Sequence, residues 1–137
     1  MKVKIKYERT QDGIKEISEY EGHYRKTGVS ENISFTEAET KTKHLLKIKE
    51  DIMKWTRSVD INGRSFSNEL EFGEGVTDIL EYVTPHGKIC MDVSTKKYKL
   101  LRDEGSGLPR IELEYDIWQT GTVVSEYKVT VGLCILQ

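Results

Sequence analysis

Apolar and polar residues alternate with a period of two along most of the chain. The pattern is clearest over residues 3–7, 111–117 and 127–135, where every second residue is aliphatic or aromatic. This period is typical of a β-strand with one buried and one solvated face. Similar runs cover residues 14–26, 33–39, 52–59, 64–72, 76–83, 88–94 and 96–102, and Leu46 and Ile48 mark a further run. The pattern therefore predicts about ten short strands.

Tight turns separate these runs. Asp12-Gly13 and Asn62-Gly63 are dipeptides that favour two-residue hairpin turns, and Gly121 follows Thr120 before the last run. Thr84-Pro85-His86-Gly87 is interpreted as another hairpin corner, with a functional role for His86 as the alternative. Gly22, inside a strand-like run, predicts a bulge or a sharp bend. The strands should therefore form an antiparallel meander.

Two segments also fit a helix. Apolar residues of 76–83 recur at helical spacing, and Ser34 with Glu37 could form a capping box before a helix that runs through Lys49. We favour strands in both places, because Val76-Thr77 and Tyr82-Val83 are poor helix formers and the other connections are hairpin-sized.

The predicted architecture is all-β, with residues 1–137 as one domain. A meander of about 8–10 strands must close or stack to hide its edges, and one polar and one apolar face per strand fits a single antiparallel barrel. Composition agrees, because Val, Ile and Thr number 34 and Ala38 is the single alanine.

Charge and cysteine usage narrow the classes of function. The formal net charge of −2 and the pI of about 6.0 argue against binding to nucleic acid. No run is apolar enough for a signal peptide or a membrane span, so we expect a cytoplasmic protein that does not bind membranes. Cys90 and Cys134 should be free thiols packed as small apolar groups. No motif calls for a cofactor or a metal.

A set of motifs in a fixed order resembles a known family. The set comprises Phe35-Thr36-Glu37, Arg57-Ser58, Phe72-Gly73-Glu74-Gly75, Tyr82-Val83-Thr84-Pro85-His86-Gly87, Val93-Ser94-Thr95, and Ile111, Leu113, Tyr115, Gly121 and Ser125. Together these resemble the YwiB-like family of small bacterial proteins of unknown function. The resemblance covers nearly the whole chain and implies a calycin-like (lipocalin-like) β-barrel. It implies no activity.

The candidate site lies inside this barrel. Glu37 continues the strand phase of Phe35, and Arg57 continues that of Trp55, so all four side chains should point inward. We predict a buried Glu37–Arg57 pair that anchors the polar end of a ligand, with both residues at the barrel rim or in solvent as the alternative. Aromatic residues then line the interior or simply fill it; the candidates are Phe35, Trp55, Tyr82, Tyr115 and Tyr127.

Three interpretations of function follow. The leading one is a non-catalytic barrel that binds a small, partly apolar molecule. The second is a structural or interaction module with a solid barrel core; Trp118, expected on the outer face, would then mark a partner surface such as that of a homodimer. The third is a hydrolase that uses the carboxylates of Glu37 and Glu39, expected on one strand face.

Overall fold

The chain folds entirely into strands and turns. The computed structural model describes residues 1–136, and the side chains of residues 82–84 lie outside what it describes. The predicted all-β fold class is confirmed, and the ten strands are β1 (Lys2–Gln11), β2 (Ile14–Thr27), β3 (Ser30–Glu37), β4 (Thr42–Ile48), β5 (Met53–Ile61), β6 (Arg64–Phe72), β7 (Thr77–Thr84), β8 (Gly87–Arg102), β9 (Pro109–Gln119) and β10 (Thr122–Ile135).

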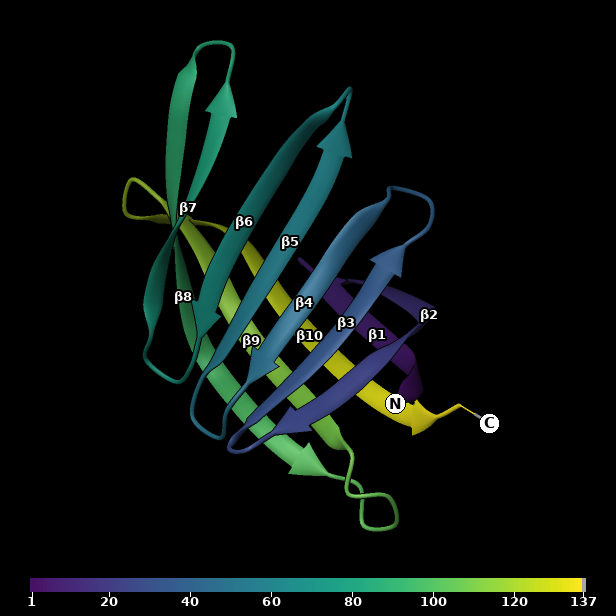
Figure 1. Ribbon diagram of the computed structural model, residues 1–137. Helices are drawn as coiled ribbons and strands as arrows, with labels where there is room; N and C mark the ends of the chain where they lie inside the picture. The colour runs from purple at the N-terminus through teal and green to yellow at the C-terminus, as the bar shows by residue number, and fades with distance from the viewer. Residues whose placement is uncertain (137) are drawn as a thin grey trace.

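The strands form one antiparallel meander that curls into a nearly closed barrel. Each strand pairs with its sequence neighbours, except that β6 and β7 do not pair, and β1 pairs instead with β10. The sheet order is therefore β6-β5-β4-β3-β2-β1-β10-β9-β8-β7. Figure 1 shows the sheet wrapping round, with β1 and β10 side by side. The predicted barrel and its meander are confirmed.

The predicted hairpin dipeptides occupy their turns. Asp12 and Gly13 have φ angles of 49° and 86°, and Asn62 and Gly63 have 51° and 77°. Two successive residues with positive φ are the signature of the type I′ turn, which matches the twist of the strands that it joins. The corner at residues 84–87 is likewise a hairpin, because Thr84 pairs with Gly87.

Both segments with a helical alternative are strands. Residues 77–84 form β7, and the charged stretch after Ser34 is divided between β3 and β4. A lone helix in either place would have left the neighbouring strands without a hydrogen-bonded partner.

Two local predictions differ from the structure. The runs 88–94 and 96–102 form one long strand, β8, whose register to β9 shifts between Thr95 and Lys97. The bulge changes the inward residues from odd numbers, such as Val93 and Thr95, to even numbers, such as Tyr98. Gly22 lies in continuous register between β1 and β3, so of the bulge and the sharp bend predicted as alternatives there, the bulge is absent. A Cβ at Gly22 would lie only 2.3 Å from the Ser34 carbonyl oxygen, so the glycine allows a close crossing of strands.

The two ends of the barrel differ. One end carries the termini and the loop at residues 103–108, and we call it the closed end. There Glu31 is only 3% exposed and receives hydrogen bonds from both terminal nitrogens of Arg102, at 2.8 and 2.6 Å, and from the Tyr24 hydroxyl. The other end, which carries the β1–β2 and β3–β4 turns, we call the cavity end.

Aliphatic and aromatic side chains fill the middle of the barrel and the space beside the closed end. The residues that are less than 2% exposed are Val3, Ile5, Ile33, Leu46, Ile48, Met53, Phe72, Val93, Ile111, Leu113, Val129 and Val131. Each of these inward positions follows the predicted period of two, apart from the change of phase in β8.

The ladder is broken between β6 and β7, and we call this gap the seam. Near the closed end, side chains bridge it: the Glu71 N–H on β6 donates to Asp78 Oδ2 on β7 at 2.8 Å, and the N–H of Gly73, directly after β6, donates to the Thr95 hydroxyl on β8 at 3.4 Å. Towards the cavity end the hairpins of β5–β6 and β7–β8 diverge (Figure 1).

The outer surface confirms one prediction and contradicts another. Trp118 lies on the outer face and is 36% exposed, as its phase predicted. Cys90 and Cys134 are both free, but both are exposed rather than packed inside, because each alternates with the inward-facing residues of its strand and so lies on the outer face. Within residues 1–136 there is no helix of the length and hydropathy needed to cross a membrane.

Candidate functional site

A cavity of about 350 Å³ opens into the barrel at its cavity end. Strands β1 to β5 and the β3–β4 turn supply its walls. The lining residues are Tyr7, Arg9, Glu16, Ser18, Tyr20, Glu37, Glu39, Thr40, Thr42, His44 and Arg57. Those on strands lie on the inward faces, in the phase of the core residues. The cavity is therefore part of the barrel interior that the core does not fill.

Aromatic rings separate the cavity from the solid core. The ring of Phe35 is stacked between two rings that line the cavity, with centroids 5.1 Å from Tyr20 and 4.5 Å from His44. Tyr7 meets Trp55 edge to face at 5.8 Å. Such pairs are favourable beyond the area that they bury. The cavity thus has a rigid, aromatic inner wall.

Glu37 points into the cavity and is held by its neighbours. The Tyr20 hydroxyl donates to Glu37 Oε1 at 3.3 Å, and the Thr40 hydroxyl donates to Oε2 at 3.0 Å. Its side chain is 27% exposed. The predicted inward direction of Glu37 is correct, and two hydroxyl groups fix its carboxylate at the wall.

Arg57 also lines the cavity, but it does not pair with Glu37. Among the described side chains no ion pair joins the two, so the predicted direct pair is wrong. The reason is strand order: β4 lies between β3 and β5, so Glu37 is opposite Thr42 and Arg57 is opposite His44 rather than opposite each other. The Arg57 guanidinium instead lies over the Trp55 indole, 4.8 Å from the ring centroid, in a cation–π contact.

His44 is a site residue that the sequence analysis did not single out. It is 5% exposed, and the indole N–H of Trp55 donates to its Nδ1 at 3.0 Å. Burial lowers the pKa of the His44 imidazole, and the nearby Arg57 charge lowers it further, while Glu37 acts in the opposite direction. His44 is in phase with Leu46 and Ile48, and this phase was the available signal that it points inward.

The remaining predicted residues have different positions. Trp55 and Tyr115 are buried, at 2% and 5% exposure, and belong to the core rather than to the lining. Burial raises the pKa of the Tyr115 phenol to about 12. The backbone of Tyr82 pairs with Ile89 in the β7–β8 hairpin, and its side chain lies outside the described residues.

Glu39 is not on a strand. β3 ends at Glu37, and Glu39 lies in the following turn, exposed but at the rim of the same cavity. The prediction that Glu37 and Glu39 share one strand face is therefore wrong. The alternation of residues 33–39 continued into a turn, which a period of two cannot distinguish from a strand.

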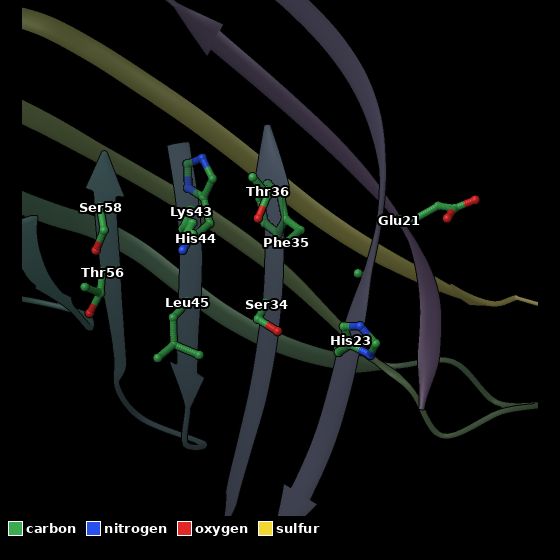
Figure 2. A pocket seen from close by; sticks show the side chains of 11 residues that line it. Glu21, His23, Ser34, Phe35, Thr36, Lys43, His44, Leu45, Thr56 and Ser58 are labelled. Carbon is green, nitrogen blue, oxygen red and sulfur yellow. The ribbon is translucent and has the colours of Figure 1, made fainter. Parts of the chain in front are cut away.

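A second hollow, of about 450 Å³, lies on the opposite side of the same strands. Figure 2 shows side chains from β2 to β5 around it, among them Ser34, Leu45, Thr56 and Ser58. These residues alternate with the inward ones, so this hollow is a groove on the outer face of the sheet. Neither Glu37 nor Arg57 lines the groove, and we take the interior cavity as the candidate site.

Comparison with known proteins places the chain in a family. A domain of unknown function, DUF1934, matches residues 2–131. The chain belongs to the DUF1934 family. A solved structure, that of the ywiB protein from Bacillus subtilis, is similar over 98% of this chain and 91% of that one, with a TM-score of 0.60 and 20% sequence identity. The predicted YwiB-like membership is confirmed, and the structural similarity supports the fold. No curated protein matches the chain.

Proposed function

We propose that this member of the DUF1934 family is a non-catalytic barrel that binds a small, partly apolar molecule inside its cavity end. The observation that carries the proposal is the interior cavity of about 350 Å³, in which an aromatic wall meets the charged groups of Glu37 and Arg57. Ligand sites are usually concave and apolar, with a few converging polar groups, and have volumes of about 300–1,000 Å³.

Arg57 supports a binding role. Its guanidinium has no carboxylate partner within 4.0 Å among the described residues, and the Trp55 ring fixes its position. A preoriented guanidinium is a strong partner for a carboxylate or phosphate, since it donates two parallel hydrogen bonds. We therefore assign Arg57 the role of anchoring the polar end of the ligand.

Native mass spectrometry of the protein purified from its own cells tests this proposal. We expect one small molecule per chain, lost on denaturation. The same preparation of Arg57→Met should be largely empty, and Arg25→Met, at an exposed position on β2, should stay loaded. A wild-type protein that is empty under conditions that preserve non-covalent complexes would contradict the proposal.

An interaction module is the second candidate. The exposed indole of Trp118 and the unpaired edges at the seam favour it, because both are features that a second protein chain could cover. The native mass spectrum also gives the number of subunits. An empty dimer would favour this second function over ligand binding.

A further inference from the structure

The interior cavity contains two opposite charges that do not neutralise each other. Glu37 is on β3 and Arg57 is on β5, and β4 lies between them. Because neighbouring strands are about 4.8 Å apart, the two backbones are roughly 9–10 Å apart. Each charged group faces the same cavity. The space between them therefore has a negative side and a positive side.

The other charges at this end do not change that polarity. Arg9 forms an ion pair with Glu16, at 3.1 Å, so these two compensate each other. Glu39 lies at the rim and adds to the negative side. The positive side retains Arg57, with His44 directly opposite it across the β4–β5 ladder.

His44 contributes an unused donor between the two charges. Its Nδ1 accepts the hydrogen bond from Trp55, so in the neutral imidazole the proton is on Nε2. That Nε2 is buried and has no hydrogen-bond partner, and it lies 3.6 Å from Glu37 Oε2, beyond hydrogen-bond distance. Buried donors are rarely left unsatisfied in native proteins. A ligand atom that accepts a hydrogen bond at this point would satisfy it.

We infer that the ligand is a small zwitterion of the α-amino-acid type. Its carboxylate would bind the Arg57 guanidinium and the His44 Nε2–H, and its ammonium group would bind the Glu37 carboxylate. Its apolar side chain would pack against the rings of Tyr7 and Tyr20, which line the cavity and are backed by Phe35. This inference rests on the proposed binding function and names the class of ligand.

Charge balance favours a zwitterion over a singly charged ligand. A simple carboxylate would bind Arg57 but would be repelled by Glu37 a few ångströms away. A simple amine would bind Glu37 but would be repelled by Arg57. Each charged wall thus attracts one end of a zwitterion and disfavours the analogue that lacks that end.

Three matched probes test the inference: L-phenylalanine, 3-phenylpropionate, which lacks the ammonium group, and 2-phenylethylamine, which lacks the carboxylate. Binding is followed by isothermal titration calorimetry. We expect wild-type protein to bind L-phenylalanine at least about tenfold more tightly than either analogue, as expected for one lost ion pair in a partly buried site. Arg57→Met should reduce the affinity for L-phenylalanine to that of the amine, and Glu37→Gln to that of the carboxylate.

The outcomes separate this inference from the proposed function. An analogue that binds as tightly as L-phenylalanine, or no binding of L-phenylalanine at millimolar concentration, overturns the zwitterion assignment. The proposed function depends instead on the native mass spectrum, so a carried ligand with a single charge would support that function and overturn this inference. Glu50→Gln and Arg25→Met, both exposed and away from the cavity, serve as matched controls, and circular dichroism confirms folding of each variant.

Discussion

At the scale of single residues, Glu31 shows how one charge can hold the closed end of the barrel together. Its carboxylate is almost fully buried and bonds to Arg102, which is 71 positions further along the chain. The Arg102 guanidinium lowers the pKa of the Glu31 carboxyl below its ordinary value of 4.5, against the opposing effect of burial. Breaking this pair would leave an uncompensated charge in the interior.

We predict that Glu31→Gln reduces the free energy of unfolding by about 2 kcal/mol at pH 7. Since the pKa is lowered in the folded state, the unfolded chain takes up a proton first as the pH falls. The contribution is complete above about pH 4.5 and is lost as the pH falls through the folded pKa. Urea denaturation at a series of pH values measures this.

The variant should therefore be less sensitive to acid than the wild type below pH 4.5. Glu50→Gln, at an exposed turn, is the control and should leave both stability and its pH dependence unchanged. Equal acid sensitivity of Glu31→Gln and wild type would contradict the assignment of this charge.

The directions of site residues were predictable from the sequence, but their partners were not. Strand phase correctly predicted that Phe35, Glu37 and Arg57 point inward, because a period of two fixes the face on which each residue lies. It does not fix the register between strands, which brings His44 opposite Arg57, and the predicted pair overlooked that the order of the meander places β4 between Glu37 and Arg57. Glu37 and Arg57 are therefore two separate charged groups on the cavity wall, and not the predicted ion pair.

At the scale of elements, the seam between β6 and β7 depends on a few side-chain bonds. Asp78 bridges it by accepting the Glu71 N–H at one carboxylate oxygen, and it accepts the Ile79 N–H at the other. In an ordinary pair of neighbouring strands, many backbone hydrogen bonds would hold the two strands together. Protection of the Glu71 N–H at the seam should therefore depend strongly on this one residue.

We predict that Asp78→Ala lowers the free energy of unfolding by about 1–2 kcal/mol and speeds amide exchange at Glu71, because the bridging acceptor is lost. Asp78→Asn keeps an acceptor oxygen and should remain close to wild type. Hydrogen exchange followed by NMR measures both variants. Unchanged exchange at Glu71 in Asp78→Ala would show that the seam is held in another way.

Strands and turns were the most predictable elements. The alternation of residues and the Asp12-Gly13 and Asn62-Gly63 turns fixed most of the strands and the meander, since each signal is local. The exceptions have local causes as well. The runs on either side of Lys96 belong to one strand, β8, which contains a bulge there. The alternation of polar and apolar residues continues past the end of β3 into the turn that contains Glu39.

At the scale of the whole molecule, the barrel divides into a solid half and a hollow half. The buried aliphatic residues and the Glu31–Arg102 pair stabilise the closed end, and the cavity end contains the side chains proposed to bind a ligand. Composition could predict that a core forms, but not where it stops, because that depends on how strands of different length and tilt come together. The side chains that line the cavity should therefore contribute less to the stability of the fold than the buried core does.

The pairing of β1 with β10 places the two chain ends side by side, while β6 and β7 form no ladder and are covalently linked by the short segment from Gly73 to Val76. A circular permutant, with residues 1 and 136 connected by a short glycine-serine linker and new termini at Glu74, would run from β7 through β10 and β1 to β6. All nine strand ladders would then join consecutive strands. We expect this permutant to fold into the same barrel, with a far-ultraviolet circular dichroism spectrum like that of the parent; a random-coil spectrum would show that the covalent link across the seam is required.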